Sequence, residues 1–235
     1  MVILCGGRGT RLQKHTQSIP KPLVEIGGQP ILWHVIQIYL AQRFRRFLLL
    51  TGYLGEQVQE FVADRAWPSG TEIRCLETGE DTPTGGRLHR AAGELEGDFC
   101  LTYADGVADV DLDALLAYHS GHGAAATMTV VRPELQFGVA RLGADGVVQG
   151  FTEKPRSEHW INGGFFCFTP EVLRLVHDDS VLERQPLQGL AATGGLRAYR
   201  HAGFWHCMDT YKDAVLLNDL WELDPPQPAP WKLWS

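Results

Sequence analysis

No apolar run in this 235-residue chain approaches the ~20 residues that a membrane-spanning helix needs. The longest candidate, residues 47–51, has only the length of a strand. The first residues, Met-Val-Ile-Leu-Cys-Gly-Gly, carry no basic segment and no small-residue cleavage site. We therefore expect a buried strand there and not a signal peptide. Together these absences predict a protein with no membrane partner.

Cysteine is sparse and shows no metal-binding or redox spacing. The five cysteines are odd in number, and none lies in a Cys-x-x-Cys pair. Four of them, Cys5, Cys75, Cys100 and Cys167, fall in apolar stretches typical of strands. We expect small core side chains with reduced thiols, and reduced thiols indicate a cytoplasmic location.

Basic residues do not predominate, because the net charge is −7. An acidic chain lacks the basic face that nucleic-acid binding usually needs, so we expect no nucleic-acid partner. The charge is nevertheless uneven. The segment before the first acid, Glu25, holds Arg8, Arg11, Lys14 and Lys21. This segment is either a local anion site or a chance basic cluster on a solvated face.

Strand-like runs alternate with helical patterns in the first half of the chain. We expect strands at 2–5, 47–51, 72–76, 99–103, 126–131, 147–151, 164–168 and 196–201, and helices at 31–42, 54–63, 111–119, 170–177 and 211–223. Alternation of this kind predicts an α/β fold with a parallel, doubly wound sheet, and shorter connections predict a mixed second half. With no linker or repeat, residues 1–235 are expected to form a single domain, in which 209–235 supply a C-terminal helix and a Trp-rich tail.

A glycine-rich loop directly follows the first expected strand. It contains Gly6, Gly7 and Gly9, interleaved with Arg8, Thr10 and Arg11. Glycines let a backbone approach a phosphate, and arginines add charge-assisted hydrogen bonds. The loop is not a P-loop, because Gly-Lys-Ser/Thr is absent, and the dinucleotide fingerprint fails at Leu12. A purely structural tight turn remains the alternative.

Lys21 lies between Pro20 and Pro22. The prolines favour an extended, stiff segment, which would hold the lysine in position for a phosphate. Together with the glycine loop, this lysine points to a phosphate-containing ligand at the end of the first strand.

The resemblance to a known family rests on several segments spread over nearly the whole chain. They are 6–12, 21–34, 78–79, 84–88, 103–107, 137–138, 153–155, 160–166, 203–205, 208–210 and 229–232. The chain resembles the nucleotidyltransferases that make NDP-sugars. The Thr-Gly-Gly-Arg segment at 84–87 and the Ile-Asn-Gly-Gly-Phe-Phe segment at 161–166 make it most similar to the glucose-1-phosphate cytidylyltransferase branch.

The resemblance implies a Rossmann-like (GT-A-like) open sheet, mostly parallel and flanked by helices. It also implies a reaction in which CTP and glucose 1-phosphate give CDP-glucose and pyrophosphate. Two polyanions must then meet, so positioning and electrostatics are expected to carry the catalysis.

The resemblance also implies roles for individual residues. Catalytic residues are Arg11 and Lys21, and Mg²⁺ is held by Asp105 and Asp209. The nucleotide is bound by Gly6, Gly7, Gly9, Thr10, Thr82, Gly85, Gly86 and Arg87, and the sugar phosphate by Glu153, Lys154, Asn162 and Gly163. For each aspartate the alternative is a turn or N-cap residue, and for 84–87 it is a glycine-rich turn with a solvated arginine.

Other functions stay open. The same fold can use another nucleotide (dTTP, UTP or GTP) or another sugar 1-phosphate. A catalytically inactive nucleotide-binding or sugar-binding relative is a distant alternative, as is a glycosyltransferase, which Lys21 and the absence of Asp-x-Asp disfavour. The expected partners are the two small-molecule substrates and further copies of the chain in a homo-oligomer.

Overall fold

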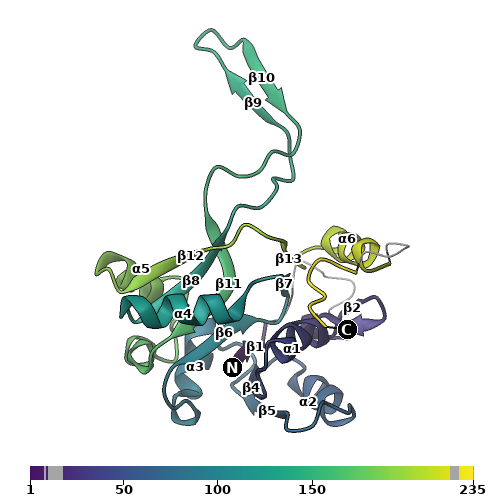
Figure 1. The fold of residues 1–235 in the computed structure, drawn as a ribbon, viewed down its shortest axis with the longest axis vertical. Helices are drawn as coiled ribbons and strands as arrows, with labels where there is room; N and C mark the ends of the chain where they lie inside the picture. Colours follow the sequence, from purple (N-terminus) through teal and green to yellow (C-terminus); the bar gives the residue numbers. More distant parts are fainter. Residues whose placement is uncertain (8, 10–17, 223–227, 235) are drawn as a thin grey trace.

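A seven-stranded sheet forms the centre of the computed structural model, which describes residues 1–7, 9, 18–222 and 228–234. The strand order is β12-β8-β11-β6-β1-β4-β5 (Figure 1). The strands are β1 (Val2–Leu4), β4 (Arg46–Thr51), β5 (Glu72–Glu77), β6 (Phe99–Tyr103), β8 (Ala126–Val131), β11 (Ile161–Phe168) and β12 (Leu196–Arg200). All neighbours pair in parallel except β11, which is antiparallel to β6 and β8. The expected α/β fold with a mixed, mostly parallel sheet is therefore confirmed.

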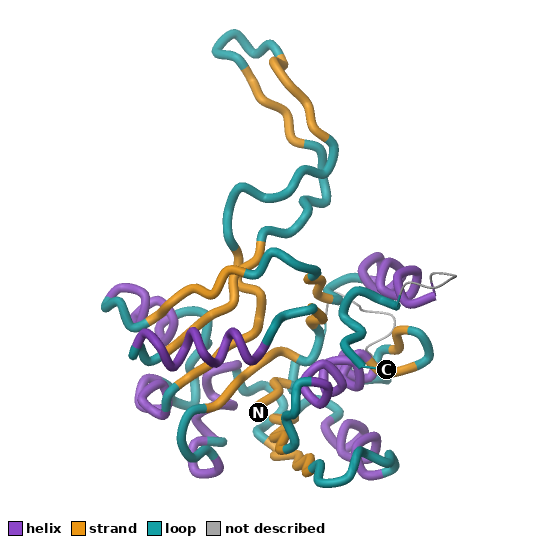
Figure 2. Tube along the Cα trace, in the orientation of Figure 1, coloured by secondary structure: helices purple, strands orange, loops and turns teal. Residues whose placement is uncertain are grey.

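Both faces of the sheet are buried, as expected for central parallel strands made of continuous apolar runs. Alternate residues point to opposite faces, so Ile3 and Leu49 join one hydrophobic cluster while Val2 and Leu50 join the other. The helices are α1 (Ile31–Ala41), α2 (Gly55–Ala63), α3 (Thr84–Arg90), α4 (Leu112–His122), α5 (Gln185–Ala192) and α6 (Tyr211–Glu222). Helices α1, α2, α4 and α6 contribute to the first cluster, and α3 and α5 to the second (Figures 1 and 2).

Four of the expected helices form near their predicted bounds, and the fifth differs. Residues Pro170–Leu175 make a 3-10 helix in place of the predicted α-helix at 170–177. Helices α3 and α5 were not predicted, because the Gly85–Gly86 pair and the Gln185–Pro186 start resemble turns. In α3 the glycines serve close packing, since a Cβ on Gly85 would lie 2.7 Å from the Cβ of Ser180.

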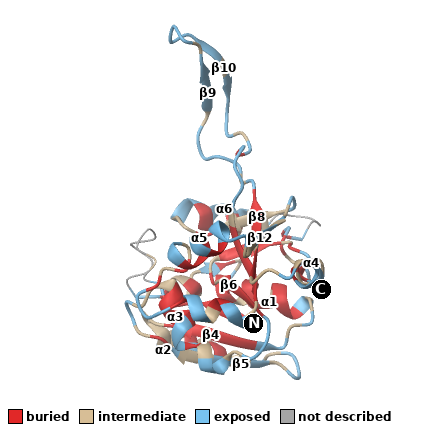
Figure 3. Cartoon of the chain, turned by 90° about the vertical axis from the view of Figure 1, so that its left-hand side faces the viewer, coloured by how far each residue is buried: buried red, intermediate tan, exposed pale blue. Residues whose placement is uncertain are grey.

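A hairpin of β9 (Val139–Leu142) and β10 (Val148–Thr152) projects from the body between β8 and β11 (Figures 1 and 2). The strand predicted at 147–151 therefore exists, but it pairs with β9 and lies outside the central sheet. The hairpin is largely exposed (Figure 3), including Phe137, Leu142 and Phe151. We call residues 134–156 the arm.

The described part of the C-terminal tail packs on the domain. The Trp231 side chain is fully buried and stacks on Phe204 and Trp221, with ring centroids 5.4 and 6.1 Å away. Among the described residues, no helix is long and apolar enough to cross a membrane.

His34 on α1 connects this tail to the core. Its Nε2 donates to the carbonyl oxygen of Ile26 at 2.8 Å, and its Nδ1 accepts from the Trp231 Nε1 at 3.3 Å. These two contacts require the neutral imidazole with its proton on Nε2. Burial lowers the pKa of His34 to about 4, although the hydrogen bonds to backbone groups oppose that shift.

We predict that His34 makes the fold sensitive to acid. Because its pKa is lower in the folded chain than in the unfolded chain, unfolding takes up a proton between pH 6.5 and about 4. Stability is full above that window and falls as the pH drops through it, by about 3 kcal/mol in total. Urea unfolding followed by tryptophan fluorescence should show this slope in the wild type.

His34→Gln should flatten the slope, because glutamine does not titrate, whereas His159→Gln, at an exposed position, should leave it unchanged. Identical slopes for wild type and His34→Gln would show that His34 does not control the acid response.

Candidate active site

A cavity of about 440 Å³ opens at the carboxyl ends of the central strands. In open α/β sheets this edge is where ligands bind. The lining comes from the end of β1 and the loop after it, the Lys21–Pro22 segment, the start of α3, the end of β6 with the loop after it, and Asp209. It consists of Leu4, Cys5, Gly6, Gly7, Gly9, Lys21, Pro22, Thr82, Pro83, Thr84, Arg87, Tyr103, Ala104, Asp105 and Asp209.

A small antiparallel ladder brings the two candidate metal ligands together. Strand β7 (Gly106–Ala108) begins directly after Asp105 and pairs with β13 (Trp205–Cys207), which ends just before Asp209. The backbone N–H of Met208 then donates to the carbonyl oxygen of Asp105 at 2.8 Å. Residues far apart in the sequence thus meet at one rim of the cavity.

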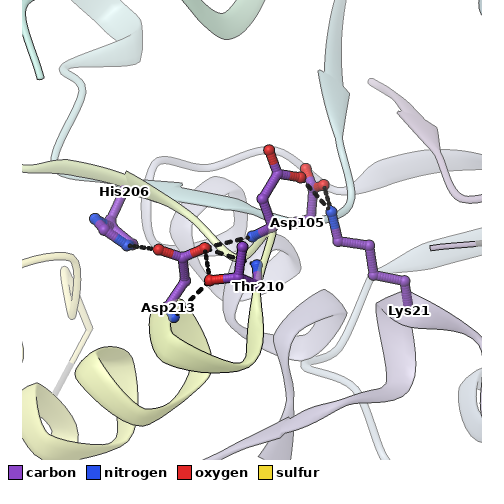
Figure 4. Close-up of polar contacts among 6 residues, drawn as sticks. Lys21, Asp105, His206, Thr210 and Asp213 are labelled. Atoms are coloured by element: carbon purple, nitrogen blue, oxygen red, sulfur yellow. Dashed lines mark hydrogen bonds and ion pairs between the residues drawn. The ribbon is translucent and has the colours of Figure 1, made fainter. Parts of the chain in front are cut away.

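Lys21 lies between the two aspartates (Figure 4). Its Nζ donates to Asp105 Oδ2 at 2.5 Å and to Asp209 Oδ1 at 2.8 Å. Pro20 is extended as predicted, but Lys21 itself opens a 3-10 turn, Lys21–Leu23. Burial alone lowers the pKa of Lys21, but attraction and hydrogen bonds from both aspartates outweigh it and raise the pKa above its usual value. The lysine side chain is therefore charged at neutral pH.

The donor set suits a magnesium ion. The carboxylates of Asp105 and Asp209 converge on one ammonium group, so both can reach a single cation. Magnesium in nucleotide enzymes is typically held by one or two carboxylates together with substrate phosphates and water. Within the described part of the chain, no group of three or more His, Cys, Asp or Glu side chains forms a closed metal cage.

Asp213 on α6 was not foreseen as part of the site. Its Oδ2 accepts hydrogen bonds from the backbone N–H groups of Asp209 and Thr210, at 3.1 and 2.7 Å, and from the Thr210 hydroxyl at 2.8 Å. Its Oδ1 lies 3.1 Å from His206 Nε2 (Figure 4). The Thr-x-x-Asp spacing is a capping-box pattern and was the sequence signal that could have identified it.

Arg87 faces the protein backbone as well as the cavity. The guanidinium donates to the carbonyl oxygens of Gly6, Thr51, Gly79 and Glu80, at 2.7–3.1 Å, and to the Thr78 hydroxyl. Burial lowers its pKa, while nearby acids such as Glu77 oppose the shift. A Cβ on Gly6 would overlap the guanidinium, which explains the glycine there. Contact between Arg87 and a nucleotide stays a prediction.

The structure places the other predicted nucleotide residues in three ways. Gly6, Gly7, Gly9 and Thr82 line the cavity. Gly85 and Gly86 are buried against residues 178–180, where the Gly86 N–H donates to Ser180 at 3.0 Å. Thr10 and Arg11 lie outside the described residues.

The predicted sugar-phosphate residues are divided between the arm and the sheet. Glu153 and Lys154 are exposed on the arm and are not part of the cavity lining. Asn162 and Gly163 lie on β11 and are not part of the cavity lining either. The Asn162 side-chain amide donates to the Tyr103 hydroxyl at 3.4 Å, and the Gly163 carbonyl accepts from the Trp205 ring at 2.7 Å.

Glu183 joins the two sides of the cavity wall, and sequence reasoning missed it. One of its oxygens accepts from the Tyr103 hydroxyl, and the other accepts from Thr84 Oγ1 at 2.7 Å. Burial and the neighbouring Glu183 raise the pKa of Tyr103, so the phenol stays protonated and donates. This contact joins the start of α3 to β6, and Asn162 extends it to β11.

Comparison with known proteins places this chain in a family. The model for the nucleotidyl transferase family matches residues 1–203. The chain is 41% identical to a probable glucose-1-phosphate cytidylyltransferase of Bacillus subtilis and 40% identical to glucose-1-phosphate cytidylyltransferase of Salmonella typhimurium. Both alignments cover at least 99% of each protein. A mannose-1-phosphate guanylyltransferase catalytic subunit beta of Drosophila pseudoobscura is 31% identical over 90% of this chain and 59% of its own length.

Solved structures agree on the fold. The crystal structure of HddC from Yersinia pseudotuberculosis superposes with a TM-score of 0.74 at 22% identity, covering 94% of this chain and 98% of HddC. The family model and the full-length similarity to glucose-1-phosphate cytidylyltransferases show that the chain belongs to the nucleotidyl transferase family of enzymes.

Proposed function

We propose that this protein transfers a cytidylyl group from CTP to glucose 1-phosphate, which yields CDP-glucose and pyrophosphate. Full-length identity of about 40% to glucose-1-phosphate cytidylyltransferases supports the choice of substrates. The observation that carries the chemistry is Lys21, whose ammonium lies between Asp105 and Asp209 at the rim of the cavity.

In the proposed reaction, an oxygen of the sugar phosphate attacks the α-phosphorus of CTP. A new phosphorus–oxygen bond forms as the bond to the bridging oxygen of the β-phosphate breaks, and pyrophosphate leaves with the negative charge. No general base is needed, because the attacking phosphate is already ionised at neutral pH. The protein therefore has to position two polyanions and stabilise their charge.

Lys21 suits the second task. Its ammonium has three donors on one nitrogen, and two of them are directed at Asp105 and Asp209. Phosphate oxygens entering the cavity meet a charged lysine that is already fixed in place, so little reorganisation is needed when charge develops on the departing pyrophosphate. Arg11 and the backbone N–H groups of Gly6, Gly7, Gly9 and Thr10 are proposed to bind the same phosphates.

Asp105 and Asp209 are the proposed holders of Mg²⁺. The bound ion would neutralise phosphate charge and polarise the phosphorus that is attacked. The two carboxylates orient towards one point, and the Lys21 ammonium offsets their mutual repulsion.

The remaining binding roles are also proposals. Thr82, Gly85, Gly86 and Arg87 are proposed for the nucleotide, with Arg87 shaping the backbone as well as facing the cavity. Glu153, Lys154, Asn162 and Gly163 are proposed for glucose 1-phosphate. Asn162 is linked to the cavity through Tyr103.

The direct test is a pyrophosphate-release assay with Mg²⁺ and glucose 1-phosphate, run separately with CTP, dTTP, UTP, ATP and GTP. Release with CTP alone is expected. Release with another nucleotide would keep the chemistry and change the base. A parallel reaction with GTP and mannose 1-phosphate tests the activity named for the Drosophila relative. Inactivity with all five nucleotides and with a panel of sugar 1-phosphates would contradict the proposed function.

Three substitutions test the charged centre. Asp105→Asn and Asp209→Asn should abolish turnover, because each removes a negative charge from the proposed metal site.

Lys21→Ala should raise the activation free energy by about 2–4 kcal/mol, by analogy with the loss of one charge-stabilising donor. Steady-state kinetics give these values, with Arg43→Ala as a control that removes an exposed cation on a distant surface ion pair with Asp113. Near-normal rates in either aspartate variant would contradict the metal assignment.

We also propose a reducing, cytoplasmic environment and a homo-oligomer. All five cysteines are free thiols, which suits a reducing compartment.

The arm supports the proposed oligomer, because Phe137, Leu142 and Phe151 are 78%, 64% and 66% exposed. A two-stranded hairpin is marginally stable by itself in water, and contiguous exposed apolar surface typically marks a protein–protein contact. A second copy of the chain is the proposed occupant.

The arm can be tested by sedimentation velocity. Phe137→Ser combined with Phe151→Ser should lower the oligomer mass or shift its dissociation to micromolar concentrations, because the substitutions remove the largest apolar side chains of the arm. Leu175→Ser is the matched control, since it removes an apolar side chain that is 46% exposed on the body. An unchanged mass distribution for the double variant would exclude the arm as the contact.

A further inference from the structure

Asp213 is a buried carboxylate that contacts the segment carrying Asp209. Its residue is 6% exposed, and its two oxygens are directed at four donors. Three of these donors belong to Asp209 and Thr210, and the fourth is His206 on β13 (Figure 4). A buried carboxylate is costly without such partners, so this arrangement fixes Asp213 firmly.

Part of this arrangement is ordinary helix capping. Thr210 precedes α6, its hydroxyl lies 3.3 Å from the Asp213 backbone N–H, and Asp213 accepts from the Thr210 backbone N–H. That reciprocal pair is a capping box. It leaves two contacts unexplained, the bond from the Asp209 N–H and the contact with His206. Neither of these is required to start a helix.

The two extra contacts of Asp213, together with one backbone bond from Met208, fix the position of Asp209. On one side, the Met208 N–H donates to the Asp105 carbonyl, which holds the segment to the start of β7. On the other side, Asp213 accepts from the peptide N–H of Asp209 itself. His206 on β13 holds Asp213 in turn. The backbone is thereby anchored at the residue before Asp209 and at the N–H of Asp209 itself, which constrains how its carboxylate approaches Asp105.

We propose that Asp213, oriented by His206, is a positioning residue that holds Asp209 at the cation site. The inference rests on the proposed metal role of Asp105 and Asp209. Partners of this kind, which contact a metal ligand and not the metal, typically change metal affinity by 10–100-fold when removed.

A role in position can be separated from a role in charge. Asp213→Ala removes both the acceptor and the charge, whereas Asp213→Asn keeps one acceptor oxygen. His206→Ala removes the donor but leaves the Asp213 charge in place, and His206→Gln restores an N–H near the position of Nε2. Positioning predicts that the two alanine variants weaken metal binding by about tenfold and that the asparagine and glutamine variants retain more of it.

The experiment measures Mn²⁺ binding to the full-length protein by electron paramagnetic resonance of the free ion, with half-saturating Mg²⁺ in turnover as a second readout. Thermal melting reports folding of each variant. Thr210→Ala is the matched control, because it removes the hydroxyl of the capping box but keeps the backbone donors. It should lower the melting temperature and leave Mn²⁺ affinity within about twofold of wild type.

Wild-type Mn²⁺ affinity in folded His206→Ala and Asp213→Ala, combined with its loss in Asp209→Asn, would overturn the positioning role and keep the metal site. Unchanged affinity in Asp209→Asn would overturn the metal assignment and this inference with it. The transfer reaction itself is decided separately by the pyrophosphate assay. If Asp213→Ala does not fold, the Mn²⁺ affinity of His206→Ala decides between the outcomes, because the His206 side chain is 26% exposed and less embedded than that of Asp213.

Discussion

The guanidinium of Arg87 binds the carboxyl ends of three neighbouring strands to one another. It donates to Gly6 after β1, to Thr51 at the end of β4 and to Gly79 after β5. Buried carbonyl oxygens beyond the regular ladder are costly when unpaired. Arg87 donates to all three, although the Thr51 oxygen also accepts from the backbone N–H and the hydroxyl of Thr78. The charge of the guanidinium is distributed among these oxygens and those of Glu80 and Thr78. The glycine loop starts from this fixed point, so the geometry of the phosphate side of the cavity depends on it.

The opposite rim is organised by charge. Lys21, Asp105 and Asp209 come from three separate segments, and their opposite charges hold them together where the sheet itself supplies no backbone pairing. The β7–β13 ladder provides the remaining constraint. At one rim, neutral carbonyl oxygens surround the Arg87 guanidinium. At the other rim, two carboxylates flank the Lys21 ammonium. The Lys21 rim carries one positive and two negative charges, so a polyanion suits this cavity together with the proposed cation at Asp105 and Asp209.

The fold was largely predictable because local pattern determines it. Apolar runs such as 47–51 and amphipathic stretches such as 31–42 specify elements without knowledge of their neighbours. The structure brings Lys21, Asp105 and Asp209 together, and their roles stay predictions. What could not be predicted depends on distant partners. Helix α3 contains Gly85 and Gly86 and is stabilised by its packing on residues 178–180. Glu183 reaches Tyr103 from a distant segment, and no periodicity reveals such a contact. The arm has strand-like sequence but no place in the sheet, which local pattern also does not encode.

The arm connects two properties that are otherwise unrelated. Glu153 and Lys154 follow β10 directly, so the proposed sugar-phosphate residues lie on the same excursion as the exposed Phe137 and Phe151. Asn162, by contrast, lies on β11 and is fixed by Gly164 and Tyr103. One part of the proposed sugar-phosphate site thus lies on the central sheet and the other part lies on the arm. A contact that holds Phe151 in place would also restrain Glu153 and Lys154, because only Thr152 separates Phe151 from Glu153. The backbone of Lys154 is also in the left-handed region, which few residues adopt. The proposed oligomer contact and the proposed sugar-phosphate residues therefore share one segment of the chain, whereas the described residues that line the cavity lie on the body.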